Sequence, residues 1–283
     1  IKCENRAVTA LDHCVTEVTA PGQSVDFVAD ITDGTKFNDA PCSVSQSLYM
    51  SEPYQFTVDA AVMSEYQNTS FALWFKVEKF EHASLGTLLM TKVNRNYNNT
   101  WTENVWGEMW TAIRPAGYAK NNNIGRDNAE NELSLCADAP YAGYPNYEHN
   151  NDVDILSDGY SLMPGVWYHV CAVKSGRALK LYLNGKLIAS GNSRGANPKD
   201  WRGAKFYVGG TMTNLASFTG WVDEVQIWSK ALTADEVKLA MKGYASAPTN
   251  LEGYFTFEET KTDSDGYIYF PNKGQNASAV PGG

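Results

Sequence analysis

The alternation of apolar and polar residues predicts β-strands along most of the chain, and residues 165–190 show it most clearly. Across 166–173, successive side chains point to opposite faces of a strand, and both sets are largely apolar. A strand that is apolar on both faces is covered on both, as in a two-sheet sandwich. This segment therefore predicts a central strand of such a sandwich.

Two tight turns follow this strand. Ser175-Gly176 is typical of a turn, residues 179–183 alternate again, and residues 186–189 run back. Between the last two segments, Asn184-Gly185 supplies the two positive φ angles that a type I′ turn requires. The pattern predicts three consecutive antiparallel strands.

Other segments with strand patterning are spread over the remaining chain. They are 24–30, 48–50, 54–63, 71–77, 85–93, 107–114, 132–136, 206–210, 218–228 and 251–257. One short helix is predicted from Thr233 to about Met241, because Thr233 is a favourable N-cap and Glu236 completes a capping box. Between 94 and 160 we expect only two strands, with long loops making up the rest.

Four motifs lie in order along the second half of the chain. They are W-Y-H-V followed by L-Y-L-N-G-K-L within 167–187, F-Y-V-G-G at 206–210, F-T-G-W-V-D-E-V-Q-I-W at 218–228 and A-L-T-A-D-E-V at 231–237. Together they resemble the laminin-G-like and pentraxin-like domains of the concanavalin A-like lectin/glucanase superfamily. The resemblance implies an all-β fold, a two-sheet antiparallel jelly-roll sandwich with one short helix near the C-terminus. We expect an N-terminal extension over 1–20, the sandwich over 21–258 and a surface tail over 259–283.

Charge and composition narrow the classes of partner. The chain has 283 residues and a net charge of −9, which argues against nucleic acid and anionic membranes as partners. No apolar run approaches the roughly 20 residues of a membrane helix, so we expect no membrane insertion. The resemblance implies a secreted or cell-surface protein.

Aromatic residues and asparagines are concentrated between 94 and 160, where the loops are predicted. Sugar rings stack on Trp and Tyr, and placed polar groups bind their hydroxyls, so this composition predicts a site for a polysaccharide or other glycan. The candidate carbohydrate-binding residues are Trp101, Trp106, Trp110, Tyr118, Tyr141, Tyr144 and Tyr147. The alternative is that Trp106 and Trp110 belong to the core and that the tyrosines pack the loops.

Two groups of carboxylates raise the possibility of catalysis. Retaining glucanases of this superfamily carry spaced carboxylates on one strand, and the matching positions here are Asp152, Asp154 and Ser157, with Asp158 one residue out of phase. We favour a solvated acidic turn before Gly159, or a cation site. A second pair, Glu130 and Glu132, alternates on one face, and exposed charge at a strand edge is the interpretation that we favour for it. We therefore expect no catalytic residues.

A structural calcium ion is a further expectation from the resemblance. Relatives bind one through the aspartate of the D-E-V strand and through an N-terminal loop. The matching residues are Asp223 and, in the loop, Asp33 and Gly34. Calcium takes six to eight oxygen ligands, which loops rich in Asp and carbonyls provide. The alternative is that Asp223 caps a turn or pairs with a base.

The cysteines leave two interpretations open. Cys136 and Cys171 both lie in predicted strands, where they could form a disulfide or remain buried thiols. The resemblance places Cys171 where pentraxins have one half of a disulfide, but the strand 71–77 that should hold the other half has no cysteine. The disulfide of the family is therefore absent or rewired here.

Three functions follow from these patterns. The first is a non-catalytic, lectin-like carbohydrate-binding domain. The second is a glycoside hydrolase or polysaccharide lyase that uses the same groove. The third is a protein–protein adhesion module, since fold alone does not decide among them.

Overall fold

The structure is a computed structural model of the chain. It describes residues 46–51, 56–59, 67–80, 87–90, 94–95, 108–117, 129–138, 155–193, 204–210 and 218–275. The predicted N-terminal extension and the predicted strand 24–30 lie outside these residues. No helix among the described residues has the length and apolar character needed to cross a membrane.

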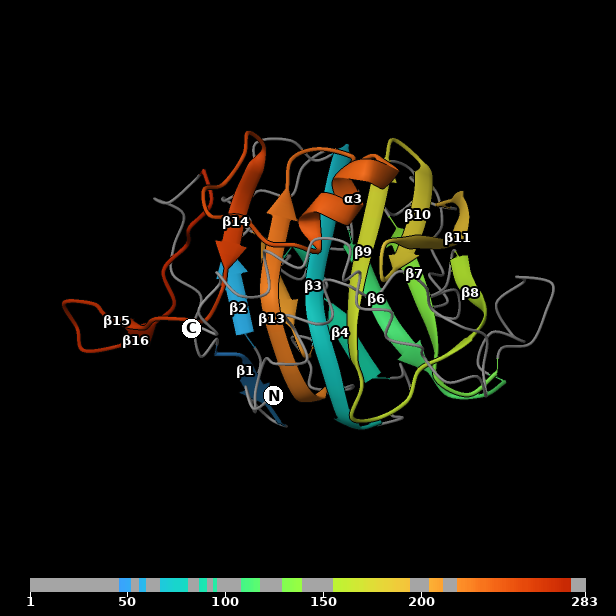
Figure 1. The fold of residues 1–283 in the computed structure, drawn as a ribbon, viewed down its shortest axis with the longest axis horizontal. Helices are drawn as coiled ribbons and strands as arrows, with labels where there is room; N and C mark the ends of the chain where they lie inside the picture. The colour runs from blue at the N-terminus through green and yellow to red at the C-terminus, as the bar shows by residue number, and fades with distance from the viewer. Residues whose placement is uncertain are drawn as a thin grey trace, which may run out of the picture.

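Two antiparallel sheets form the fold, and Figure 1 shows one in front of the other. The front sheet, here called sheet A, has the strand order β1-β13-β3-β9-β10-β11, with β14 also paired to β13. Its strands are β1 (Leu48–Met50), β3 (Asn68–Lys79), β9 (Trp167–Ser175), β10 (Ala178–Leu183), β11 (Lys186–Asn192), β13 (Thr219–Trp228) and β14 (Leu251–Phe255).

The second sheet, here called sheet B, has the order β2-β12-β4-β6-β7-β8, with β5 also paired to β12. Its strands are β2 (Phe56–Asp59), β4 (Thr87–Met90), β5 (Asn94–Arg95), β6 (Glu108–Arg114), β7 (Glu132–Asp138), β8 (Ile155–Ser161) and β12 (Ala204–Val208). A two-stranded hairpin, β15 (Lys261–Thr262) with β16 (Ile268–Tyr269), lies apart from both sheets. The expected all-β antiparallel sandwich is confirmed.

The main core lies between the inner faces of the two sheets. Phe71, Leu73 and Phe75 of β3 alternate inward, and they share one buried cluster with Met109 and Ile113 of β6. The remaining inward residues of β9, β7 and β13 join the same cluster. This alternation is the period-2 pattern of the sequence, and burying large side chains in this way contributes about 1.5–3 kcal/mol each to folding.

A second buried layer covers the outer face of sheet A. The helix α3 (Ala234–Ala240) lies across β3 and β9 (Figure 1), and Val237 packs in one cluster with Cys171, Tyr182 and Trp228. Both faces of β9 are buried, as its sequence predicted, because α3 supplies the cover that a sheet face otherwise lacks.

Polar contacts fix the helix on the sheet. The indole N–H of Trp74 donates to the carbonyl of Met241 at 3.1 Å, and the Gln226 amide donates to the carbonyl of Ala240 at 2.9 Å. The hydroxyl of Tyr254 accepts the N–H of Tyr244 at 3.0 Å. The first two bonds satisfy carbonyl groups at the C-terminal end of the helix, and the third satisfies a backbone N–H just beyond it.

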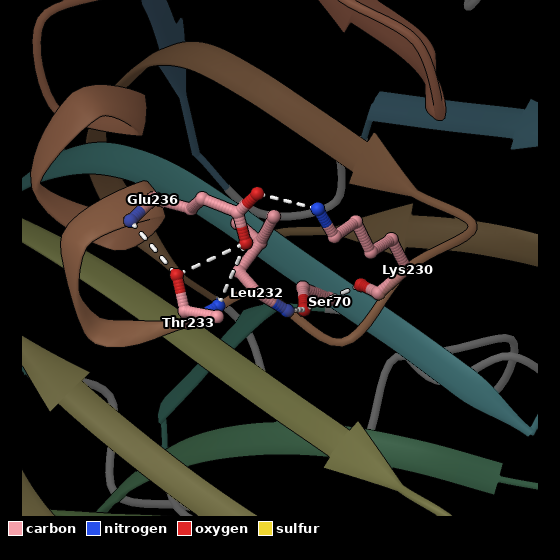
Figure 2. Close-up of polar contacts among 5 residues, drawn as sticks. All are labelled: Ser70, Lys230, Leu232, Thr233 and Glu236. Atoms are coloured by element: carbon pink, nitrogen blue, oxygen red, sulfur yellow. Dashed lines mark hydrogen bonds and ion pairs between the residues drawn. The ribbon is translucent and has the colours of Figure 1, made fainter.

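The N-terminal end of the helix has the predicted capping box. The hydroxyl of Thr233 accepts the N–H of Glu236 at 3.3 Å, and the Glu236 carboxylate accepts the N–H of Thr233 at 3.0 Å. Figure 2 shows that the same carboxylate also binds Lys230. Ser70 of β3 holds the preceding loop, because its hydroxyl donates to the Lys230 carbonyl and accepts the N–H of Leu232.

The predicted turn between β10 and β11 is confirmed. Asn184 has φ of 47° and Gly185 has φ of 76°, as a type I′ turn requires. Asn184 also binds β9 with its side chain, whose Oδ1 accepts the N–H of His169 at 2.8 Å. The His169 ring is fully buried against Trp74 on the outer face of sheet A, 5.3 Å between ring centroids.

Strand β8 corrects the prediction for 94–160. The acidic turn expected before Gly159 is wrong for residues 155–158, because they lie within β8 (Ile155–Ser161). Gly159 has φ of 74°, and the pairing of β7 with β8 shifts register between Glu132 and Ser134. The glycine therefore marks a bulge inside a strand, which resembles a turn in sequence. The short strand β5 and the hairpin β15–β16 were not predicted either.

The two described cysteines cannot form a disulfide with each other. Cys171 lies on the outer face of sheet A, beneath α3, whereas Cys136 lies on the outer face of sheet B with Trp110 and Ala112. Both thiols are reduced and buried, and burial raises the pKa of Cys171. The residue directly opposite Cys171 on β3 is Ala72, which is the position that a cross-strand disulfide would need.

The segment after β14 returns to the sheet. Lys273 donates its backbone N–H to the carbonyl of Tyr254 at 2.8 Å, and Gln275 donates to the carbonyl of Leu251 at 2.7 Å. The Asn272 side chain accepts the N–H of Tyr254 and donates to the carbonyl of Glu252. The hairpin β15–β16 projects from the side of the sandwich beyond β14 (Figure 1), and Tyr267 and Ile268 on it are exposed.

Candidate functional site

The outer face of sheet B carries an unusual set of buried polar residues. Because Met109 and Ile113 of β6 point into the core, the alternating residues Trp110, Ala112 and Arg114 point outward. On β7, Glu132, Ser134 and Cys136 are directly opposite Arg114, Ala112 and Trp110 in that order. All six residues are buried, and they form the candidate site, here called the β6–β7 face.

Arg114, the last residue of β6, lies at one end of the β6–β7 face and reaches back to Trp110 and Ser134. Its side chain is fully buried, and its guanidinium carbon lies 4.7 Å from the centroid of the Trp110 ring. The Arg114 Nε–H donates to the hydroxyl of Ser134 at 2.7 Å, and that hydroxyl donates to the carbonyl of Ala112 at 3.3 Å. A buried guanidinium needs such contacts because losing its hydration is costly. The contacts hold one planar cation against one aromatic ring.

Glu132 ties this face to the bulge in β8. One carboxylate oxygen accepts the N–H of Gly159 at 2.8 Å, and the other accepts the N–H of Ala129 at 3.2 Å. The residue is buried in the middle of the sheet, so the prediction of exposed edge charge is wrong for Glu132. Glu130 is exposed, as predicted, and lies in the turn before β7, where it accepts the N–H of Ala116.

Ser157 occupies the position of the catalytic acid in the hypothetical glucanase arrangement. Its hydroxyl accepts the N–H of Leu133 at 3.0 Å and donates to the carbonyl of Tyr160 at 3.5 Å. The side chain is fully buried and connects β7 to β8. Ser157 therefore has a structural role, because its hydroxyl joins the backbones of β7 and β8. Asp152 and Asp154 lie outside the described residues.

Among the seven predicted carbohydrate-binding residues, the structure describes Trp110. Its side chain points away from the core between the sheets, and it is 4% exposed. Trp101, Trp106, Tyr118, Tyr141, Tyr144 and Tyr147 lie outside the described residues. The sequence did not single out Arg114 or Ser134, although their alternation with Trp110 and Cys136 was a signal that could have placed them on the same face.

Asp223, the predicted calcium ligand, lies on the opposite side of the molecule. It is directly opposite Trp74, on the outer face of sheet A, and it is fully buried. Its Oδ1 accepts the N–H of Glu224 at 2.7 Å, and Glu224 has φ of 51° in a bulge of β13. The described residues contain no group of three or more His, Cys, Asp or Glu that could hold a metal ion, and Asp33 and Gly34 lie outside them. A buried carboxylate oxygen fits calcium, but it is a single ligand of the several that calcium takes.

Comparison with known proteins supports the fold. Residues 98–238 match the family model described as the concanavalin A-like lectin/glucanases superfamily. No curated protein matches the chain. A Bacteroides ovatus crystal structure, described as that of a candidate carbohydrate-binding protein, is 18% identical and covers 84% of this chain with a TM-score of 0.56. This chain spans only 57% of the length of that protein.

Two other solved structures are similar to this chain at lower TM-scores. The heptameric SAP-like pentraxin from Limulus polyphemus is 14% identical, with 82% of this chain and 95% of the pentraxin covered and a TM-score of 0.44. The CBM40 module of the Ruminococcus gnavus IT-sialidase is 17% identical, with 69% and 96% covered and a TM-score of 0.47. Residues 98–238 match the family model, and the structure has the two-sheet architecture that the family implies. This chain therefore belongs to the concanavalin A-like lectin/glucanases superfamily as a laminin-G-like jelly-roll domain.

Proposed function

We propose that this chain is a non-catalytic, lectin-like domain that binds a glycan outside the cell, at the β6–β7 face. The observation that carries the proposal is the buried pair of Arg114 and Trp110, held by Ser134. Ligand sites combine an aromatic wall with a few placed polar groups, and this face of sheet B has both. The name of the Bacteroides ovatus relative is consistent with the same class of function.

The topology supports placing the ligand at one end of this face. Glu108 at the start of β6 is directly opposite Asp138 at the end of β7, so the chain enters β6 and leaves β7 at the same end of the sheet. In sequence, Trp106 and Tyr141 lie within three residues of that end. Trp106 therefore precedes β6 in sequence and Tyr141 follows β7, the two strands of the β6–β7 face.

The same face gives a reason to favour binding over catalysis. The Glu132 carboxylate accepts two backbone N–H groups, and the Ser157 hydroxyl also binds backbone. A general acid or a nucleophile needs an oxygen that can reach the substrate, whereas both carboxylate oxygens of Glu132 and the hydroxyl of Ser157 bind backbone groups of the protein. Both residues stabilise the β7–β8 pair in this proposal.

A glycan array with the wild-type chain is the first test, followed by calorimetric titration of the best ligand. We expect Trp110→Phe and Arg114→Lys to weaken binding about tenfold or more, since each keeps bulk or charge but loses ring area or the fork of the guanidinium. Ser157→Ala is the matched control, which should leave affinity unchanged in the folded protein. Absence of any glycan ligand, or reducing-sugar release by the chain, would refute the proposal.

We propose in addition that calcium binds through Asp223. The support is the buried carboxylate and the bulge that fixes it, together with the resemblance that predicted the site. Ligand linkage then gives a higher melting temperature with calcium and a lower one with a chelator. Asp223→Asn should remove this response, and Asp235→Asn, an exposed change in α3, should not. An unchanged response in Asp223→Asn would remove Asp223 from the site.

A further inference from the structure

A row of four side chains crosses the outer face of sheet A, and its end on β9 packs against Met241, the C-cap residue of α3. Tyr49 of β1 is directly opposite Trp221 of β13, Trp221 is opposite Lys76 of β3, and Lys76 is opposite Trp167 of β9. Residues in this register share one face of a sheet. The row, here called the transverse row, therefore runs at right angles to four adjacent strands.

The side chains of the transverse row are in mutual contact. The rings of Tyr49 and Trp221 lie 4.9 Å apart between centroids, and Lys76 Nζ lies 4.2 Å from the Trp221 centroid and 5.3 Å from that of Trp167. Trp167 is buried, whereas Trp221 and Lys76 are partly exposed and Tyr49 is 46% exposed. The row thus rises from a buried end at β9 to an open end at β1.

A glycine in β13 and a bulge in β3 set the positions of the side chains at the exposed end of the transverse row. A Cβ atom at Gly220 would lie 2.1 Å from the carbonyl oxygen of Lys76, so only glycine lets β13 approach β3 here. The register between β13 and β3 shifts beside Gly220 and gives β3 one extra residue, Glu78. Such a bulge redirects a side chain. Glu78 accepts the hydroxyl of Tyr49 at 2.6 Å, and this hydrogen bond raises the pKa of Tyr49.

We propose that the transverse row is a second glycan site, which takes a neutral oligosaccharide lying across the strands. The inference rests on the proposed function, because it assigns a further surface to the same class of ligand. Adjacent strands are about 4.8 Å apart, so the three positions that reach the surface span about 10 Å, which suits two linked sugar rings. Tyr49 and Trp221 supply ring surface for stacking.

Charge decides which class of sugar fits. Lys76 offers hydrogen-bond donors and Glu78 offers acceptors, two residues apart on the same strand face. A sugar hydroxyl both donates and accepts, so a neutral ring can use both groups, whereas an acidic sugar would meet the Glu78 carboxylate. The net charge of −9 opposes acidic ligands further.

The test is calorimetric titration with cello-, xylo- and manno-oligosaccharides of two to six units, and with oligogalacturonides as acidic probes. We expect at least one neutral series to bind, with affinity that levels off after two or three units. Tyr49→Ala should weaken that binding about tenfold. It is the primary variant because an exposed side chain is removed without loss of core packing. Tyr49→Phe should retain most of the affinity, since the ring remains. Trp221→Phe gives a second test with a smaller ring.

Controls separate this inference from the proposed function. Tyr267→Ala removes an exposed tyrosine on the β15–β16 hairpin and should change nothing. Loss of binding in Trp110→Phe but not in Tyr49→Ala or Trp221→Phe would overturn the second site and leave the proposed function intact. The reverse result would support the transverse row and refute the β6–β7 face. Binding of acidic probes alone would overturn the neutral ligand, and no binding at all would overturn both proposals.

Discussion

The outer faces of the two sheets are buried by different means. Sheet A presents apolar side chains such as Cys171, Tyr182 and Trp228, and the helix α3 covers them with Val237 and Ala240. Sheet B presents an arginine, a glutamate and a serine in the rows next to Trp110 and Cys136, and these polar groups are just as deeply buried.

The difference shows what each face is suited for. Apolar cover is non-directional, so it stabilises the fold without specifying much else. Buried polar groups must each find a partner, which fixes their positions and costs free energy when one is lost. Sheet A also buries polar groups on its outer face, but there Gln226 and Trp74 bind the end of α3. On the β6–β7 face, Arg114, Ser134 and Trp110 contact one another instead, and this is why we assign the main ligand site to sheet B.

The largest loss of stability should come from disrupting the packing of α3 on the outer face of sheet A. Val237→Asp places a carboxylate in an apolar layer where Val237 is fully buried, and we expect a loss of about 4 kcal/mol or more in the free energy of unfolding. Leu239→Asp is the matched control on the same helix, because Leu239 is exposed, and it should cost under about 1 kcal/mol. Equal losses in urea unfolding of the two variants would mean that α3 does not cover the sheet.

The second-largest loss of stability should come from substitutions on the β6–β7 face of sheet B. Trp110→Ala should lower the free energy of unfolding by about 3–5 kcal/mol, because the ring is buried between Arg114 and its neighbours. Ser134→Ala should cost less, about 1–3 kcal/mol, because it removes one hydrogen bond to the guanidinium. Wild-type stability of Trp110→Ala would contradict the burial of this ring.

A stabilising change can test the outer face of sheet A. Ala72→Cys places a second thiol opposite Cys171, and we expect a disulfide on oxidative refolding that adds about 2–4 kcal/mol. Oxidation should be done during refolding, since the raised pKa of buried Cys171 keeps its thiolate scarce. Mass spectrometry reports the bond, and the same variant with Cys171→Ser is the control. Two persistent thiols would contradict the register of β3 and β9.

The smallest effect is electrostatic and lies at the capping box of α3. Lys230 and the N–H of Thr233 lower the pKa of Glu236, so its contribution to stability is present above its ordinary pKa of 4.5 and is lost as the pH falls through the lower, folded value. Glu236→Gln should therefore be less stable than wild type by about 0.5–1 kcal/mol at pH 7, and the gap should close in acid. A gap that is independent of pH would mean that the carboxylate charge does not contribute.

Sequence patterns predicted the parts of this fold whose structure is set by a single local feature, such as alternation, a turn dipeptide or a capping box. Alternation predicted β9, Asn184-Gly185 predicted the turn between β10 and β11, and Thr233 with Glu236 predicted the start of the helix. Strand β8 was missed because Gly159 at positive φ looks the same in a bulge as in a turn. Single-residue alternation says which side of a strand a residue occupies, but not what covers that side.

The candidate site shows the same limit. Trp110 was a candidate from its residue type, whereas the choice between core and ligand surface depended on neighbours distant in sequence. Glu132 was interpreted as edge charge because its sequence lacks any sign of the β8 bulge that it binds. The transverse row depends on the order of four strands that are not consecutive in the chain, which local patterns do not give.

The return of residues 272–275 to β14 has a consequence for how the domain can be cut. Strand β14 pairs with β13 on one side, and the backbone of Lys273 and Gln275 binds its other side. A fragment that ends at 258 would leave that row of backbone groups open to strands of other molecules, and it would lose the packing of Phe270 against Phe56 and Phe257. We expect such a fragment to aggregate at concentrations where a chain ending at 275 stays monodisperse.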